Sequence, residues 1–202
     1  MTAASKPGGI ALCKAVRLVA VLNLAYFGVE FSVARTIGSV SLFADSIDFL
    51  EDAAINLLIL IALGWSARRR SLVGMMLAAI LFVPAVATAW TAWEKFNMPI
   101  APAALPLSLT GFGALSINLF CALLLARYRT HRGSLTRAAF LSARNDAIAN
   151  IAIIGAGALT AFTWSAWPDL IVGAGIFALN LDAAREVYGA ARAERREALA
   201  AP

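Results

Sequence analysis

The chain has 202 residues, of which 61% are hydrophobic and only 14% are charged. Soluble domains are about 45–50% apolar and about 25% charged, so this composition excludes an ordinary soluble domain. The net charge of +5 does not indicate nucleic-acid binding, because the basic residues lie in short stretches between apolar segments, where they report membrane topology. The sequence therefore predicts an all-α protein embedded in the lipid bilayer, with no nucleic-acid partner.

Six apolar segments are long enough to cross a bilayer as helices. They follow a polar tail at residues 1–9, which we expect to be flexible, and precede a short charged tail at residues 191–202. A six-helix transmembrane domain is thus expected over residues 10–190, with Gly38 as the break between its first two helices. In chain order the predicted helices cover residues 10–37, 39–65, 72–93, 107–125, 135–162 and 170–188, with a loop at 96–106 and a short turn at 164–169.

Basic residues are unevenly distributed between the two sets of predicted loops. The termini and the loops after the second and fourth helices carry most of them, including the run Arg68–Arg70, whereas the opposite loops carry only Arg35 and Lys95. The positive-inside rule then predicts that both termini are cytoplasmic. An aromatic belt is expected on the other side, where the sequence places Trp90, Trp93, Trp164 and Trp167. We expect a multi-pass protein of the inner (cytoplasmic) membrane.

Four carboxylates interrupt the second predicted helix, namely Asp45, Asp48, Glu51 and Asp52. Each charge at bilayer depth costs roughly 2.5–3.5 kcal/mol on insertion scales, so such residues need a compensating role. At about 100° per residue, Asp45, Asp48 and Asp52 share one face of the helix, whereas Glu51 lies to the other side of Asp48. A carboxylate stripe of this kind, facing the interior of a bundle, is suited to holding a cation.

The fifth predicted helix presents a second set of polar groups. Ser142 and Asp146 are four residues apart and share a face, and Asn145 can reach the same cavity. Two helices that each present oxygen ligands four residues apart can close a four-coordinate site for a divalent cation. The candidate metal ligands are therefore Asp48, Asp52, Asp146, Ser142, Asp45 and Asn145. Hydrogen bonding between helices stays open as an alternative role for these residues.

The run from Ser41 to Asp52 resembles the second transmembrane helix of the cation diffusion facilitator family, with Asp48 at a position that the family fills with His or Asp. Asp146 matches the last residue of the family motif on the fifth helix, where Ser142 replaces a His or Asp. The resemblance covers about residues 10–190. It implies six helices with cytoplasmic termini and the export of a divalent metal ion (Zn, Mn, Co, Cd or Fe) by proton antiport. It also implies no enzymatic activity and no cofactor apart from the transported ion, and it allows a homodimer.

Two departures from the family leave alternatives open. Family members usually carry a cytoplasmic domain after the sixth helix, and we expect that domain to be missing here. Ser142 makes the ligand set all-oxygen, which favours harder ions such as Mn²⁺, while the family favours Zn²⁺, so the metal stays open. The alternative functions are a transport-inactive scaffold or sensor, a partner subunit of a full-length relative, and an unrelated six-helix membrane protein such as an enzyme acting on lipids.

Overall fold

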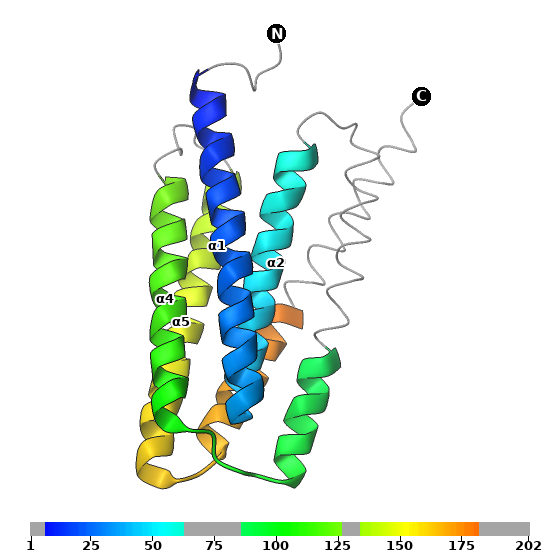
Figure 1. Cartoon of the computed structure of the whole chain (residues 1–202), viewed down its shortest axis with the longest axis vertical. Coiled ribbons are helices and arrows are strands. Elements are labelled where there is room, and N and C mark those ends of the chain that lie inside the picture. Colours follow the sequence, from blue (N-terminus) through cyan, green and yellow to red (C-terminus); the bar gives the residue numbers. More distant parts are fainter. Residues whose placement is uncertain (1–6, 63–85, 127–133, 182–202) are drawn as a thin grey trace.

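The structure, a computed structural model, describes residues 7–62, 86–126 and 134–181, and these residues form helices joined by short turns, without a strand (Figure 1). Side chains are described except at helix ends that adjoin the gaps, such as residues 134–145. Two shorter helical segments, residues 86–97 and Trp167–Leu181, accompany four long helices. The long helices are α1 (Pro7–Ile37), α2 (Val40–Ala62), α4 (Ala104–Ala126) and α5 (Ser134–Thr163). The prediction of an all-α chain is confirmed for the described residues.

Several helices extend beyond the predicted apolar segments. α1 begins at Pro7 rather than at residue 10, so residues 7–9 do not belong to the predicted tail, and α4 begins at Ala104 with Pro106 in its first turn. Proline fits the first turn of a helix, because the N–H that it lacks would have no partner there.

The predicted loops are correspondingly too long. The helix over residues 86–97 continues past the predicted end at residue 93, which reduces the loop predicted at 96–106 to residues 98–103. A hydrogen bond from Asn97 Nδ2 to the backbone oxygen of Trp93, at 2.7 Å, satisfies one carbonyl of its last turn. The last described helix begins at Trp167 rather than at residue 170.

Three helical stretches among the described residues are long and apolar enough to cross a membrane: Cys13–Ile37, Ala104–Ala126 and Asp146–Thr163. α2 has 23 residues and differs from these in its four carboxylates. At 1.5 Å per residue its length is about 34 Å, enough for a hydrocarbon core of about 30 Å. The chain is a multi-pass membrane protein. Six crossings and cytoplasmic termini stay predictions, since residues 1–6, most of the predicted third helix and the C-terminal tail lie outside the described residues.

The bundle is apolar on its outside and polar at its centre, the reverse of a soluble protein. Exposed apolar side chains include Val21, Leu24, Leu109, Phe112, Ile151 and Leu159. Buried polar side chains include Asn23, Glu30, Asp45, Asn150 and Asp169, none of them more than 1% exposed. A surrounding bilayer accounts for this arrangement, because hydrocarbon chains cover the apolar faces while the polar groups face one another.

The long helices pack as two pairs. α1 packs chiefly against α2, and α4 packs chiefly against α5. α1 and α4 join the pairs, and there the Tyr26 hydroxyl donates a hydrogen bond to the backbone oxygen of Thr110 at 2.7 Å. α2 and α5 contact each other over a shorter stretch, with an apolar cluster that includes Phe43, Ala44, Ile47, Ala149 and Ile153.

A tight turn joins α1 to α2 at the lower end of the bundle in Figure 1. Gly38 has a positive φ of 65°, a conformation that glycine adopts without the steric penalty of other residues. Ser39 then caps α2, since its Oγ accepts a hydrogen bond from the Leu42 N–H at 3.2 Å. The predicted break at Gly38 is confirmed.

Candidate cation-binding site

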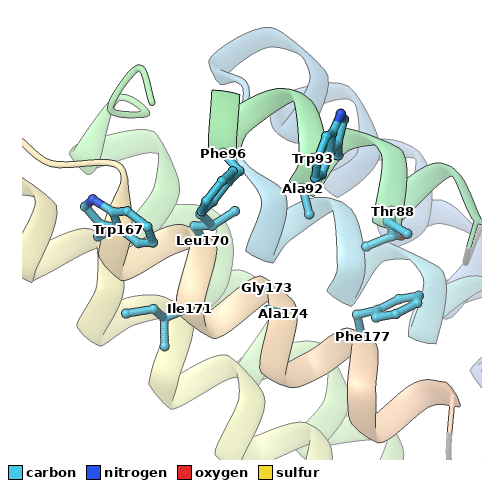
Figure 2. A pocket seen from close by; sticks show the side chains of 11 residues that line it. Thr88, Ala92, Trp93, Phe96, Trp167, Leu170, Ile171, Gly173, Ala174 and Phe177 are labelled. Atoms are coloured by element: carbon cyan, nitrogen blue, oxygen red, sulfur yellow. The ribbon is translucent and has the colours of Figure 1, made fainter. Parts of the chain in front are cut away.

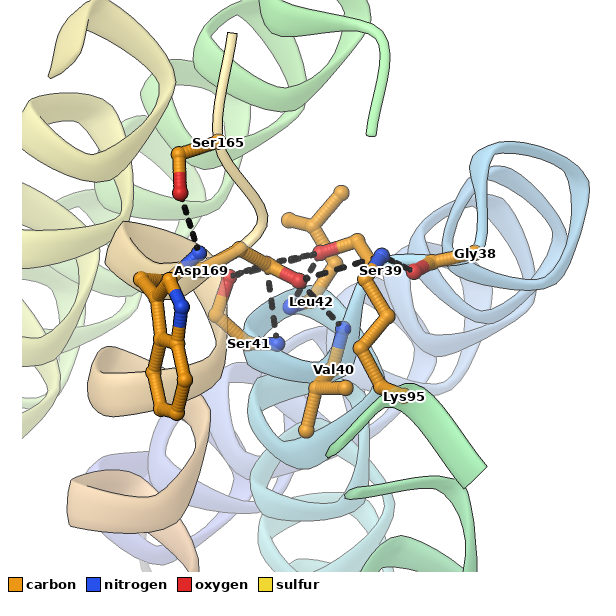
Figure 3. Close-up of polar contacts among 9 residues, drawn as sticks. Gly38, Ser39, Val40, Ser41, Leu42, Lys95, Ser165 and Asp169 are labelled. Carbon is orange, nitrogen blue, oxygen red and sulfur yellow. Dashed lines mark hydrogen bonds and ion pairs between the residues drawn. The ribbon is translucent and has the colours of Figure 1, made fainter. Parts of the chain in front are cut away.

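The first turn of α2 is hydrogen-bonded to Asp169, which lies in the first turn of the Trp167–Leu181 helix (Figure 3). The Asp169 carboxylate accepts hydrogen bonds from Ser39 Oγ and Ser41 Oγ, both at 2.6 Å, and from the N–H groups of Val40 and Ser41, at 2.9 and 3.2 Å. The first N–H groups of a helix have no partner within the helix, and a carboxylate there complements the helix dipole. Asp169 therefore fixes the start of α2, and with it the position of the carboxylates farther along this helix.

A buried lysine completes what we term the Asp169 network, which consists of Ser39, Val40, Ser41, Lys95 and Asp169. Lys95 Nζ lies 3.8 Å from Asp169 Oδ2 and donates a hydrogen bond to the backbone oxygen of Gly38. Burial lowers the pKa of the Lys95 ammonium, and the neighbouring Asp169 carboxylate opposes that shift. Because Asp169 has both its donors and a counter-ion, it is a structural group and not a candidate cation ligand.

The four carboxylates of α2 follow over the next turns of the helix. Asp45 is fully buried, whereas Asp48, Glu51 and Asp52 are half-buried. Asp48 interacts electrostatically with each of the other three. Asp52 also accepts a hydrogen bond from Asn23 Nδ2 on α1, at 3.4 Å. The predicted stripe is therefore enclosed by the bundle, and Glu51 lies close to it.

Asp146 approaches this stripe from α5. Its side chain is half-buried, and its charge interacts with those of Asp52 and Asp45. Asp48 interacts with Asp146 as well. Two like charges repel by about 4 kcal/mol at 4 Å in an effective dielectric of about 20. The arrangement is one that a cation or protons would stabilise.

The carboxylates are neighbours, but they do not form a closed coordination shell. Among the residues that the structure describes, no group of three or more His, Cys, Asp and Glu side chains could hold a metal ion as it stands. Ser142 and Asn145 lie on α5, but their side chains are outside the described part of the chain, so their roles as ligands stay predictions. A bound cation needs either such additional ligands or a closer approach of α2 and α5.

A further carboxylate on α1 lies beside Asp45. Glu30 is fully buried and interacts electrostatically with Asp45 and Asp48. Neither Glu30 nor Asp45 finds a hydrogen-bond donor among the described residues. Ionised carboxylates only accept hydrogen bonds, so a proton on either group would allow it to donate to the other. Glu30 thus extends the acidic stripe onto a third helix.

Residues 16–189 match a protein family described as the cation efflux transmembrane domain. The chain belongs to the cation efflux family. This match confirms the resemblance to the transmembrane half of the cation diffusion facilitators and supports cation transport across a membrane as the function. No curated protein matches the chain significantly.

The cation efflux domain also contains an apolar cavity, whose lining includes none of the carboxylates described above (Figure 2). The cavity has a volume of about 490 Å³ and lies between the helix over residues 86–97 and the Trp167–Leu181 helix. Its lining includes Trp93, Phe96, Trp167 and Phe177, and none of its described lining residues is ionisable. This cavity is therefore not a candidate for the cation site.

Sequence reasoning assigned no supporting role to two residues of the cation efflux domain, Asn23 and Asp169. Asn23 was detectable in principle, because Asn23, Tyr26 and Glu30 are spaced by three and four residues and so share one face of an apolar helix. The role of Asp169 carried no local signal, since its partner Ser39 is 130 residues away in the chain.

Proposed function

We propose that this cation efflux protein exports a divalent transition-metal ion across the cytoplasmic membrane in exchange for protons. Asp48 and Asp52 from α2 and Asp146 from α5 bind the ion in this proposal, with Asp45, Ser142 and Asn145 as further candidate ligands. The observation that carries the proposal is the approach of the α5 carboxylate to those of α2, inside a bundle whose exterior is apolar.

The charges of the site supply the coupling between metal and protons. Three ionised carboxylates carry three negative charges, and each charge at bilayer depth is costly, so occupation by a divalent ion or by protons lowers the energy of the site. Metal ligands must be deprotonated to bind, and metal binding therefore releases protons while protonation displaces the metal. An inward proton gradient can then drive the ion outward as the two occupants alternate.

The ligand atoms bear on which metal is exported. Carboxylate and hydroxyl oxygens favour harder ions such as Mn²⁺, and carboxylates also bind Zn²⁺. Competition among Zn²⁺, Mn²⁺, Co²⁺, Cd²⁺ and Fe²⁺ for uptake by one preparation of vesicles ranks the five ions by how well the protein transports them.

The packing of the helices provides a route for the conformational change. α2 carries Asp48 and Asp52, whereas α5 carries Asp146, and these helices belong to different pairs that contact each other chiefly through α1 and α4. A cation that binds across α2 and α5 favours the conformation in which the two helices are closest. The Asp169 network holds the start of α2, so the opposite end of α2 has the greater freedom to move.

Transport by the purified chain in liposomes tests the proposal. Vesicles with an acidic lumen receive Zn²⁺ or Mn²⁺ outside, and the wild-type protein should accumulate the ion while the lumen becomes more alkaline. Asp52→Ala and Asp146→Ala should each abolish both signals although the protein still inserts into the membrane. Glu94→Gln is the matched control, because it neutralises an exposed acid at the end of the helix over residues 86–97.

Three outcomes separate the parts of the proposal. Uptake that survives both aspartate substitutions contradicts the assigned site. Metal uptake without a change in luminal pH contradicts proton exchange. A wild-type protein that inserts but moves no metal supports the transport-inactive alternative instead.

A further inference from the structure

Asn23 is a buried amide on α1, with only 1% of its surface exposed, and both ends of its side chain are engaged. Its Nδ2 donates to Asp52 Oδ2 at 3.4 Å, and its Oδ1 accepts from the thiol of Cys121 on α4 at 3.8 Å. Cys121 is itself buried. These contacts connect three helices beside the acidic stripe, and they join the two helix pairs.

The two contacts fix which way the amide faces. An ionised carboxylate only accepts hydrogen bonds, so Asp52 requires the NH₂ end of the amide. A thiol is a weak donor, so Cys121 is satisfied by the oxygen end. Turning the Asn23 amide over would place its oxygen against the Asp52 carboxylate, so two acceptors would face each other, and the NH₂ would have only the weakly accepting Cys121 sulfur as a partner.

Asn23 therefore holds one oxygen of Asp52, namely Oδ2, and leaves Oδ1 for another ligand. Asp52 interacts electrostatically with Asp48 and Asp146, the other acids assigned to the site. Carboxylates that bind metals commonly accept a hydrogen bond from a neighbouring group, which orients the carboxylate. The amide also offsets part of the negative charge without adding a cation that would compete with the transported ion.

We propose that Asn23 is a positioning residue of the cation site, which orients the Asp52 carboxylate for the transported ion while Cys121 orients the Asn23 amide. This inference rests on the proposed function, since it assumes that Asp52 is a ligand. Asn23 acts through Asp52 and does not itself contact the ion.

Zn²⁺ uptake into liposomes by the full-length chain, measured over a range of Zn²⁺ concentrations, tests this role. Asn23→Ala should raise the KM for Zn²⁺ by about 10–100-fold, the usual effect of removing a group that orients a metal ligand, while the maximal rate is preserved. Cys121→Ser keeps a donor for Asn23 Oδ1 and should leave KM near the wild-type value. Cys121→Val removes the donor and should raise KM in the same direction as Asn23→Ala. Asn97→Ala is the matched control, because Asn97 is an exposed asparagine whose side chain donates a hydrogen bond to its own helix, at the backbone oxygen of Trp93.

The outcomes distinguish failure of this inference from failure of the proposed function. If the wild-type protein moves none of Zn²⁺, Mn²⁺, Co²⁺, Cd²⁺ and Fe²⁺, the proposed function is wrong. If the wild type moves Zn²⁺ but Asp52→Ala leaves that uptake unchanged, the assigned site is wrong. In both cases Asn23 has no site to support. If Asp52→Ala abolishes uptake but Asn23→Ala leaves KM unchanged, the positioning role alone is wrong. A merely structural role for Asn23 would lower the maximal rate and the Tm of Asn23→Ala together and leave the KM for Zn²⁺ unchanged. If Asn23→Ala does not insert, Cys121→Val decides the question, and an unchanged KM in that variant overturns the proposal.

Discussion

Replacing Asp169 with alanine tests whether this side chain fixes the start of α2. The carboxylate accepts four hydrogen bonds, two from serine hydroxyls and two from backbone N–H groups, and it lies 3.8 Å from Lys95 Nζ. Hydrogen bonds to a charged group contribute about 1.5–3 kcal/mol each, so a simple sum of four gives roughly 6–12 kcal/mol.

The expected loss is smaller than this sum, because contributions within one network are not additive. The hydroxyls of Ser39 and Ser41 are only 3.3 Å apart and can bond to each other once the carboxylate is gone. Removing one partner of a buried ion pair costs about 3–5 kcal/mol, and we expect Asp169→Ala to destabilise the protein by this amount. At about 2–4 °C per kcal/mol for a chain of this size, the Tm should fall by roughly 6–20 °C.

Thermal unfolding in detergent, followed by the loss of helical circular dichroism, measures this effect. Asp169→Asn keeps the shape of the side chain and one acceptor oxygen, so its Tm should lie between those of the wild type and Asp169→Ala. Glu94→Gln is the control, since surface substitutions usually change stability by less than about 0.5 kcal/mol. An Asp169→Ala variant as stable as Glu94→Gln would refute the reasoning.

Two glycine substitutions extend the test to the backbone, each with its own control in the same unfolding assay. Gly38→Ala should cost about 1–2 kcal/mol because the φ of 65° is strained for alanine, whereas Gly28→Ala, in open space on α1, should be neutral or stabilising. Gly173→Ala would bring a Cβ to 2.7 Å from Val40 Cγ1 and should cost about 1–3 kcal/mol by overpacking, whereas Gly175→Ala meets no atom within 4 Å and should not destabilise. A control that lowers the Tm as much as its partner would show that the loss of glycine, and not its position, is responsible.

The helices themselves could be predicted from the sequence because their signal is local. Apolar composition placed three predicted helices, over residues 10–37, 107–125 and 135–162, within a few residues of α1, α4 and α5. The errors lie at the ends, where capping groups and prolines decide the boundary rather than hydropathy. The helical repeat likewise placed Asp45, Asp48 and Asp52 on one face, because that relation involves a single helix.

Relations between helices could not be predicted in the same way. The approach of Asp146 to the α2 carboxylates depends on how α2 and α5 are placed, which the family resemblance supplied and the helical repeat alone does not. Asn23 shares a face of α1 with Tyr26 and Glu30, but this pattern does not give its partner on α4, which is 98 residues away in the chain. The bonds of Asp169 to α2 span 128 to 130 residues, and no local pattern of residues encodes them.

The long separation between α2 and its capping carboxylate also sets an order of events during synthesis. Asp169 follows Val40 by 129 residues, which a ribosome adds in roughly 6–26 s at about 5–20 residues per second. Throughout that interval the leading N–H groups of α2 must remain without the carboxylate that caps them in the finished protein. The start of α2 therefore gains its capping carboxylate only after the first turn of the Trp167–Leu181 helix has been synthesised. In a nascent chain that stalls before Trp167, α2 lacks this cap.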